Sequence, residues 1–285
     1  MIGAGLGLAL AWATSGWAVP SPPAPPRFPA KVDVVKVSVL VTGRGRPITG
    51  LHASDFEVED DGVAQKVEQF SAEERSLRVL LALDVSGSVQ GEILARLERG
   101  CAGLVDLLRP GDTAGLLTFG DDVRLIAPVG DPSVLRVRLR GLEEAAGSTA
   151  LRDAVFATLV LADTAPDRAL GIVFTDGRES ISWLPENEVS AAVRRSHSVI
   201  YGVHFGKDAF PFLGDAVAAS GGRVLSPRSA EDLPAAFAEI LQEFRTRYLL
   251  RYTPSKVAHS GWHRVRVRLK GRSAHLTYRD GYLVP

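Results

Sequence analysis

An uninterrupted apolar run that ends in a polar triplet is the most constraining feature of the sequence. Residues 77–83 are apolar except for one arginine near the start, and Asp84, Ser86 and Ser88 follow at alternate positions. A strand that is apolar on nearly every residue is typical of a parallel sheet covered on both faces. Residues 90–108 then read as a helix. We therefore expect the run to be a central strand with the triplet at its carboxyl end, where open α/β sheets bind ligands.

The triplet has the chemistry of a site for a hard divalent cation. One carboxylate and two hydroxyl groups are all oxygen ligands, and Mg²⁺ binds oxygen ligands that include several waters. Serine and aspartate are also common in turns and at helix N-termini, so the triplet alone fits an ordinary loop equally well. Two later stretches favour the metal site. Residues 147–154 form a second polar loop that opens a helix, and residues 172–177 form a second apolar strand that ends in an acid and a glycine.

With these three stretches together, the chain resembles the von Willebrand factor type A domain, including the inserted domains of integrins. The metal-ion-dependent adhesion site (MIDAS) of that family has the pattern Asp-x-Ser-x-Ser, followed by a Thr and then an Asp. Over a resemblance that spans residues 76–245, the pattern is matched in order by Asp84, Ser86, Ser88, Thr149 and Asp176. The resemblance implies that the first four bind the cation directly or through water, and that Asp176 acts mostly through water.

The resemblance also implies a non-enzymatic binding or adhesion module. In the family the cation is Mg²⁺ (or Mn²⁺/Ca²⁺), and an acidic group of a protein ligand completes its coordination. Two other functions stay open: a structural module of an envelope assembly with an unused metal site, and a metal-dependent hydrolase. A hydrolase needs a general base near the metal, for which Glu179 is the nearest candidate, and the sequence has no Gly-x-Ser-x-Gly elbow. The identity of the ligand and the oligomeric state do not follow from these residues.

Strands and helices alternate between residues 114 and 244. We expect strands at 114–119, 123–127, 170–175, 199–205 and 223–225, and helices at 132–142, 151–162, 186–196, 212–219 and 230–244. Such alternation is typical of a doubly wound, mainly parallel sheet with helices on both faces, as in Rossmann-like folds. The predicted fold class of this region is therefore α/β.

The residues on either side read as β structure. Residues 32–75 contain a valine-rich strand, and an alternating strand (55–59) joined by a turn at Asp60-Asp61-Gly62 to a strand at 66–70. The spacing of the acids in this hairpin is loosely similar to that of an EF-hand loop, but the flanking residues alternate as strands and not as helices.

A second resemblance, to a bacterial family of type A-like proteins frequent in Acidobacteria, rests on Val39-Leu40-Val41, Gly50-Leu51, Asp55-Phe56, Glu59-Asp60-Asp61-Gly62, Phe70, Tyr248–Tyr252 and Gly281-Tyr282. We expect the two β segments, each a short meander with one half-buried face, to pair into one small all-β domain.

Other polar groups have simpler interpretations. Asp121 and Asp122 lie in a strand-to-strand turn, where solvation is the usual role. His259 and His263 are four residues apart but enter a strand, so a histidine metal site is not expected. The basic residues at alternate positions of 264–270 are typical of the wet face of a half-buried strand.

Composition limits the partners and the location. The 285 residues carry 33 acidic and 33 basic side chains, so the net charge is zero and nothing favours a nucleic-acid partner. The single cysteine, Cys101, lies on the apolar stripe of the predicted helix and is expected to pack rather than react.

An apolar N-terminal segment and a Pro-rich stretch imply export, to a secreted or periplasmic/cell-envelope location, with no membrane insertion beyond an N-terminal anchor. The expected division is 1–18, signal peptide or N-terminal anchor; 19–31, Pro-rich linker; 32–75, N-terminal β segment; 76–245, type A domain; and 246–285, C-terminal β segment.

Overall fold

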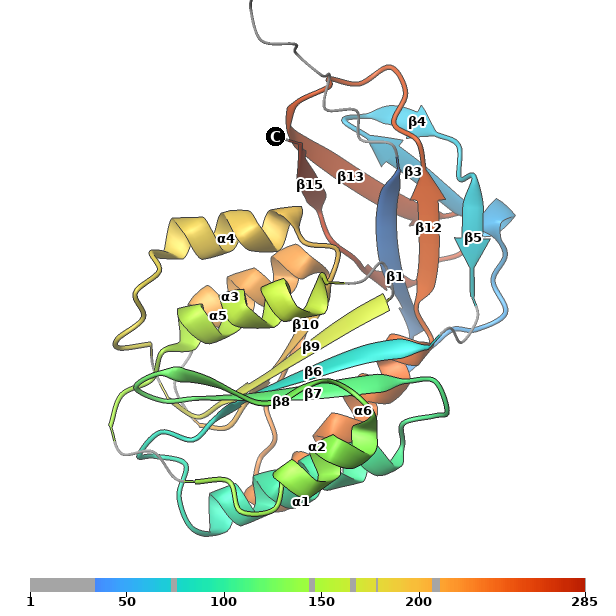
Figure 1. Ribbon diagram of the computed structural model, residues 1–285. Coiled ribbons are helices and arrows are strands. Elements are labelled where there is room, and N and C mark those ends of the chain that lie inside the picture. Colours follow the sequence, from blue (N-terminus) through green and yellow to red (C-terminus); the bar gives the residue numbers. More distant parts are fainter. Residues whose placement is uncertain are drawn as a thin grey trace, which may run out of the picture.

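The computed structural model describes residues 34–72, 76–143, 147–164, 168–177, 179–206 and 211–284. Within these ranges the chain forms an α/β part and a β part that lie against each other (Figure 1). The predicted signal peptide or anchor and the Pro-rich linker lie outside the described residues. None of the helices in these ranges is both long and apolar enough to cross a bilayer.

The α/β part is built on a six-stranded sheet. Its strands, in the order of the sheet, are β11 (Val224–Leu225), β10 (Val199–His204), β9 (Arg168–Thr175), β6 (Leu77–Asp84), β7 (Thr113–Phe119) and β8 (Val123–Gly130). All neighbouring pairs are parallel except β7 and β8. The predicted central strand is β6, which lies between β9 and β7 and is buried at every position but Arg78. The predicted mainly parallel sheet is therefore confirmed.

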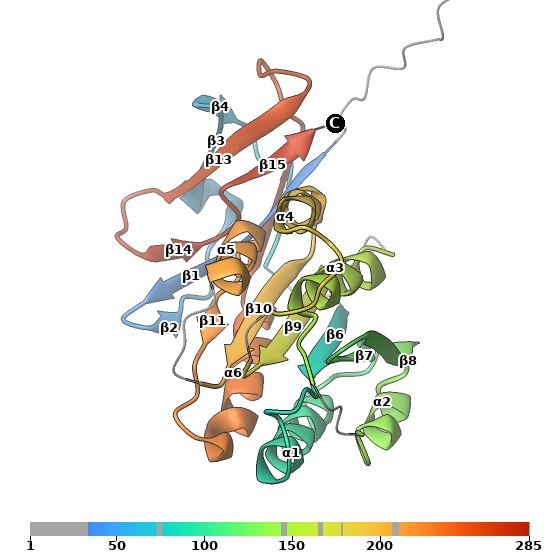
Figure 2. The ribbon, with the colours of Figure 1, turned by 90° about the vertical axis from the view of Figure 1, so that its left-hand side faces the viewer.

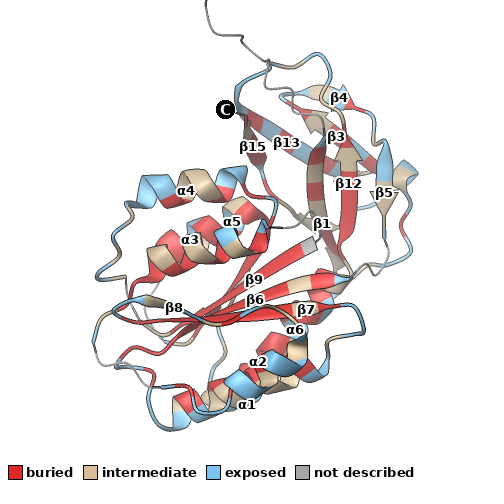
Figure 3. Cartoon of the chain, viewed as in Figure 1, coloured by how far each residue is buried: buried red, intermediate tan, exposed pale blue. Residues whose placement is uncertain are grey.

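Helices cover both faces of this sheet, as Figures 1 and 3 show. One layer consists of α3 (Leu151–Ala162), α4 (Glu186–Arg195) and α5 (Pro211–Ser220), and the other of α1 (Glu92–Asp106), α2 (Pro132–Arg138) and α6 (Leu233–Arg245). Leu81 and Leu83 pack with the α1 layer, whereas Leu80 and Ala82 pack with the α3 layer. Burial on both faces is the reason that β6 is apolar on successive residues. Cys101 is fully buried on α1, in keeping with its predicted packing role.

The connections place a ligand site at the carboxyl edge of the sheet. The chain passes from β6 through α1 to β7 on one face, and from β9 through α4 to β10 on the other. The order of strands therefore reverses between β6 and β9. Such a switch point opens a crevice at the carboxyl ends of the two strands.

The β part interleaves strands from the two ends of the described chain. One sheet has the order β14 (His275–Thr277), β1 (Val35–Gly43), β12 (Tyr248–Tyr252) and β5 (Gln69–Ser71), with β2 (Arg46–Pro47) beside β1. The other has the order β15 (Gly281–Val284), β13 (Gly261–Leu269), β3 (Phe56–Asp60) and β4 (Val63–Gln65). The predicted pairing of the two β segments is confirmed. The expectation that each segment is a meander is wrong, because backbone pairing across the two segments builds both sheets.

The predicted hairpin at Asp60-Asp61-Gly62 forms, but its second strand differs. Asp61 and Gly62 have φ values of 48° and 81°, which a two-residue type I′ turn requires. β3 pairs with β4, directly after the turn, and not with residues 66–70. Residues 69–71 instead pair with β12 in the other sheet. The basic residues of β13 face solvent, as predicted.

Two buried arginines join the β part to the α/β part. Arg247, between α6 and β12, donates hydrogen bonds to the backbone oxygen of Ser38 in β1 (3.1 Å) and to that of Gly221 after α5. Arg279, before β15, donates to two backbone oxygens at the carboxyl end of α4, each at 2.6 Å. These bonds fix the orientation of the two parts. We propose residues 76 and 245 as the limits of the α/β part.

Candidate metal site

Three loops at the carboxyl edge of the central sheet carry the five predicted ligands. Asp84 is the last residue of β6, and Ser86 and Ser88 follow it in the connection to α1. Thr149 precedes α3, and Asp176 follows β9. This edge lies on the left in Figure 1 and faces the viewer in Figure 2. The fold thus brings residues that are up to 92 positions apart in the sequence to one edge.

Asp84 is fully buried and held by two donors. Its Oδ1 accepts a hydrogen bond from the backbone N–H of Ser86 (2.9 Å), and its Oδ2 accepts one from the hydroxyl of Thr175 (2.6 Å). Thr175 is the last residue of β9, and the sequence analysis assigns it no role. The signal in the sequence that could have indicated its role is its position directly before Asp176. Burial raises the pKa of Asp84 above its ordinary value, although the bonds from Ser86 and Thr175 act in the opposite direction. A buried carboxylate of this kind favours a nearby cation.

Ser88 joins the loop after β6 to the loop after β9. Its hydroxyl donates to Oδ1 of Asp176 (2.7 Å) and lies 3.4 Å from the hydroxyl oxygen of Ser86. Burial raises the pKa of Asp176, against the effect of the bond from Ser88. Two carboxylates whose desolvation disfavours their charged forms therefore lie together with hydroxyl groups.

The loop that carries Thr149 is fixed by backbone hydrogen bonds. The N–H of Thr149 donates to Oγ of Ser180 (2.9 Å), and the N–H of Ser180 donates to the backbone oxygen of Thr149 (3.0 Å). Oδ1 of Asp121 accepts the N–H of Ser148 (2.8 Å). Asp121 and Asp122 are both exposed, as expected for solvated residues. Asp121 nevertheless positions the Thr149 loop, which the sequence did not indicate.

Oxygens from two of the three loops converge on one point beside Gly177, which lies in the third loop. A Cβ atom built on Gly177 would lie 3.0 Å from Oγ1 of Thr149, 3.6 Å from Oδ2 of Asp84 and 3.6 Å from Oγ of Ser88. Every donor in this set is an oxygen, and two of the five predicted ligands are carboxylates, which is the set that Mg²⁺, Mn²⁺ or Ca²⁺ prefers. The residues present therefore fit a divalent cation, held by Asp84, Thr149 and the serines, with Asp176 next to Ser88.

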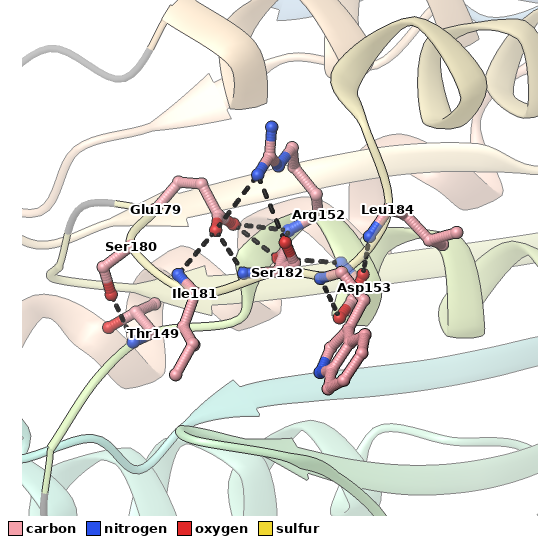
Figure 4. Close-up of polar contacts among 9 residues, drawn as sticks. Thr149, Arg152, Asp153, Glu179, Ser180, Ile181, Ser182 and Leu184 are labelled. Atoms are coloured by element: carbon pink, nitrogen blue, oxygen red, sulfur yellow. Dashed lines mark hydrogen bonds and ion pairs between the residues drawn. The ribbon is translucent and has the colours of Figure 1, made fainter.

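The loop after Asp176 is organised by Glu179 (Figure 4). Its carboxylate accepts the backbone N–H groups of Arg152 (2.9 Å), Ile181 (3.0 Å) and Ser182 (2.7 Å), together with the hydroxyl of Ser182 (2.7 Å). Burial acts to raise the pKa of Glu179, but the bonds from Ser182 and Arg152 hold it below its ordinary value. A carboxylate engaged in this way is a poor general base. Glu179 therefore has a structural role. Although it is the nearest candidate for a general base in the sequence, its hydrogen bonds make it unsuited to that role.

His204 is a titratable neighbour that the sequence did not place at the site. It is the last residue of β10 and is buried. Its charge acts to lower the pKa of Asp176. His204 is therefore a titratable group beside Asp176 that the sequence did not indicate.

A second polar group lies in the β part. Asp60, Asp61 and His263 bring three possible ligand atoms within 4.8 Å of one another. Nδ1 of His263 lies 3.3 Å from Oδ1 of Asp60 and 3.0 Å from Oδ2 of Asp61. Oδ2 of Asp60 accepts hydrogen bonds from the hydroxyls of Tyr252 (3.0 Å) and Tyr282 (2.7 Å). This network gives the buried carboxylate and the ring hydrogen-bond partners between β3, β12, β13 and β15.

Comparison with known proteins gives a match to one family. The family model of the von Willebrand factor type A domain matches residues 79–179. The comparison with curated proteins gives no match.

Solved structures share the fold at low sequence identity. A von Willebrand factor type A protein from Catenulispora acidiphila is 14% identical, with a TM-score of 0.55, over 86% of this chain and 75% of that chain. Proximal thread matrix protein 1 from the mussel byssus is 13% identical, with a TM-score of 0.53, over 62% of this chain and 49% of that chain. Another structure of the mussel protein, 15% identical with a TM-score of 0.51 over 60% of this chain and 48% of that chain, has zinc at its MIDAS motif. The present chain thus spans about half the length of the mussel chains.

The matched family, the shared fold and the sheet topology agree with one another. The further resemblance to the bacterial group frequent in Acidobacteria stays a prediction. The chain contains a von Willebrand factor type A domain, and residues 79–179 belong to that family.

Proposed function

We propose that this chain is a non-enzymatic binding module that recognises a protein ligand through a divalent cation. Asp84, Ser86, Ser88, Thr149 and Asp176 hold the cation, which is Mg²⁺ (or Mn²⁺/Ca²⁺). An acidic group of the ligand completes the coordination. The observation that carries the proposal is the convergence of oxygens from the loop after β6 and from the Thr149 loop on one point beside Gly177, in the loop after β9. The hydrogen bond from Ser88 to Asp176 ties the carboxylate of the third loop to this group.

The charges of the site favour an incoming anion. The three hydroxyl ligands are neutral, so the two carboxylates at most neutralise a divalent cation. Mg²⁺ completes its set of about six oxygens with water or with an external group. A carboxylate of a partner is a hard oxygen ligand, and because it is negatively charged it interacts more favourably with the cation than a neutral water does.

The binding function is supported over catalysis by the state of the nearby acid. Glu179 is engaged with backbone and hydroxyl donors. The zinc-occupied MIDAS motif of the mussel protein supports metal binding by this type of site. We further propose that the protein is exported to the cell envelope or secreted.

The proposal is tested by replacing the buried carboxylate. We expect Asp84→Ala, and the closer isostere Asp84→Asn, to abolish Mg²⁺ binding in calorimetry while circular dichroism stays unchanged. At a Mg²⁺ concentration near one hundred times Kd, the unaltered protein gains about 2.7 kcal/mol, which corresponds to a rise of about 5–10 °C in Tm. Both variants should show no such rise.

Glu57→Gln, an exposed carboxylate of β3, is the matched control and should respond to Mg²⁺ as the unaltered protein does. Mg²⁺ binding by Asp84→Asn at the original affinity would refute the site. Turnover of ester or phosphate substrates that is lost in His204→Gln would refute the non-enzymatic function. The protein ligand is then sought by pull-down from the native envelope fraction, with and without EDTA.

A further inference from the structure

A buried histidine in the β part faces two carboxylates from the other end of the described chain. His263 in β13 and Asp60 at the end of β3 are 1% and 0% exposed, whereas Asp61 is open to solvent. Nδ1 of His263 lies 3.3 Å from Oδ1 of Asp60 and 3.0 Å from Oδ2 of Asp61. We call these three residues the histidine cluster. The sequence did not indicate it, because Asp60 and His263 are 203 residues apart and meet only when β3 pairs with β13.

The spacing of the three atoms in the cluster fits metal coordination. Zinc binds histidine nitrogen and aspartate oxygen at about 2.0–2.2 Å, so neighbouring ligand atoms around one ion are about 3.0–3.4 Å apart. Nδ1 has this separation from both carboxylate oxygens, and all three atoms lie within 4.8 Å of one another. One ion can therefore contact all three atoms after small movements of the side chains.

Each carboxylate of the cluster is already held through its other oxygen. Oδ2 of Asp60 accepts hydrogen bonds from the hydroxyls of Tyr252 (3.0 Å) and Tyr282 (2.7 Å). Oδ1 of Asp61 accepts the backbone N–H of Arg264 (2.9 Å). The imidazole ring stacks on the ring of Tyr282, with the centroids 4.8 Å apart. Outer contacts of this kind orient metal ligands, and they leave the two oxygens that face Nδ1 available to a cation.

The cluster has more negative charge than its own residues can balance. Nδ1 carries at most one proton, so the two carboxylate oxygens that face it compete for a single hydrogen bond. The oxygen of Asp60 is the more distant of the two and belongs to a fully buried residue. Even a doubly protonated ring supplies one positive charge against two carboxylates. Because a buried carboxylate without a full partner is costly, a divalent cation in place of the Nδ1 proton would stabilise the cluster.

We propose that the histidine cluster is a second metal site, in which Nδ1 of His263 and the carboxylates of Asp60 and Asp61 bind Zn²⁺. Imidazole favours zinc over Mg²⁺, which distinguishes this site from the all-oxygen site of the α/β part. Water completes the coordination, as in other zinc sites with three protein ligands. The carboxylates belong to the N-terminal β segment and the histidine to the C-terminal one, so the ion joins the two halves of the β part. The inference does not depend on the function proposed above.

The first test measures Zn²⁺ binding by the full chain with Asp84→Asn, a background that removes the proposed site of the α/β part. Calorimetry should show one Zn²⁺ per chain, and Mg²⁺ should not replace it. Adding His263→Gln should abolish this binding. His259→Gln changes an exposed histidine of the same segment, so it is the matched control and should bind Zn²⁺ as the background does.

Asp61→Asn tests the site without disturbing the buried residues. Asparagine tolerates the φ of 48° at this position and keeps an acceptor for the N–H of Arg264, so the turn should be retained. Loss of the charged ligand should weaken Zn²⁺ binding at least about tenfold. Equal affinity in the background, in Asp61→Asn and in His263→Gln would place the ion elsewhere and refute the proposal, as would the absence of binding in the micromolar range.

The second test identifies the atom that binds the ion. With ¹⁵N-labelled histidine in the same background, Zn²⁺ should shift the Nδ1 signal of one ring, and this signal should be missing in His263→Gln. A signal that responds to pH and not to Zn²⁺ would show a hydrogen-bonded network only and would overturn the proposal.

The third test asks whether the ion joins the two segments. At a Zn²⁺ concentration near one hundred times Kd, the background should gain about 5–10 °C in Tm, and proteolysis of residues 34–72 should become slower. Asp61→Asn should show neither effect. Binding at His263 without any rise in Tm would refute the joining role. Because every variant in these tests carries Asp84→Asn, none of the results depends on Mg²⁺ binding at the α/β part.

Discussion

At the scale of single residues, the site depends on the absence of a side chain as much as on the ligands. Gly177 follows Asp176 and leaves open the point that is surrounded by oxygens of Thr149, Asp84 and Ser88. Its φ is not in the left-handed region, so alanine can adopt the same backbone. Space, and not backbone conformation, is therefore the reason for a glycine at this position.

We predict that Gly177→Ala impairs Mg²⁺ binding at least tenfold in calorimetry without unfolding the protein. The added methyl group would lie 3.0 Å from Oγ1 of Thr149, closer than ordinary contact, and would occupy the space between the ligands. Gly103→Ala in α1 is the control, because a Cβ added there would have no atom within 4 Å apart from its chain neighbours and the backbone of its own helix. That variant should keep full affinity and gain about 0.5–1 kcal/mol, since glycine weakens a helix interior. Unchanged affinity in Gly177→Ala would contradict the arrangement of ligands described here.

At the scale of elements, one short loop supports the candidate metal site of the α/β part. Glu179 and Asp153 together accept the backbone N–H groups of four successive loop residues, 181–184. Ser180 in the same loop is paired with Thr149. The loop is therefore a preorganised support, although it contains no regular secondary structure.

We predict that Glu179→Gln loosens this loop. The glutamine amide offers one acceptor oxygen where the carboxylate offered two. Some of the backbone N–H groups of Arg152, Ile181 and Ser182 therefore lose their hydrogen-bond acceptor. The expected cost is about 1–3 kcal/mol, with faster hydrogen exchange at Ile181 and Ser182 than in the exposed control Glu57→Gln. Exchange as slow as in the unaltered protein would show that Glu179 does not hold the loop.

The same carboxylate predicts a pH dependence. The folded-state pKa of Glu179 lies below its ordinary value of 4.5, so its charged form stabilises the fold. This contribution is present above about pH 4.5 and is lost as the pH falls through the folded-state pKa. Protection of the loop amides should therefore decrease below pH 4.5 in the unaltered protein and change less in Glu179→Gln.

At the scale of the whole molecule, the α/β part is inserted between the two halves of the β part. β12 lies between β1 and β5, and β13 lies between β15 and β3, so each sheet needs both ends of the described chain. Arg247 and Arg279 then bind backbone oxygens across the joint. Such an arrangement limits the freedom of the metal-binding part relative to the β part.

We predict that truncation after Phe244 exposes the N-terminal β segment. Removal of β12–β15 leaves β1, β3 and β5 without their partners from the C-terminal segment, and an isolated hairpin such as β3–β4 is marginally stable at best. Limited proteolysis should cleave residues 34–72 in the truncated chain and spare them in the full chain. Equal stability and equal protection of residues 31–244 and 31–285 would show that the two segments do not depend on each other.

The sequence by itself determined the elements and the ligand types of the candidate site. The apolar run of β6 predicted a central strand because burial on both faces leaves a local pattern, and the helix α3 was placed at its observed limits, 151–162. The residue types of the Asp-x-Ser-x-Ser loop indicated a cation site, and the resemblance to the type A domain implied Thr149 and Asp176 as further ligands. The two-residue turn at Asp61-Gly62 likewise follows from local backbone preferences.

Only the tertiary structure decided how distant segments support these elements. Thr175 beneath Asp84, Asp121 beneath the Thr149 loop and His204 beside Asp176 act across gaps of roughly 27–91 residues, and no local period marks such contacts. The assignment of β4 and β5 to different sheets, and the cluster of Asp60, Asp61 and His263, depend on strand pairing across the whole chain. Sequence patterns record which face of an element is buried, whereas the partner on that face is selected by the packing of the folded chain.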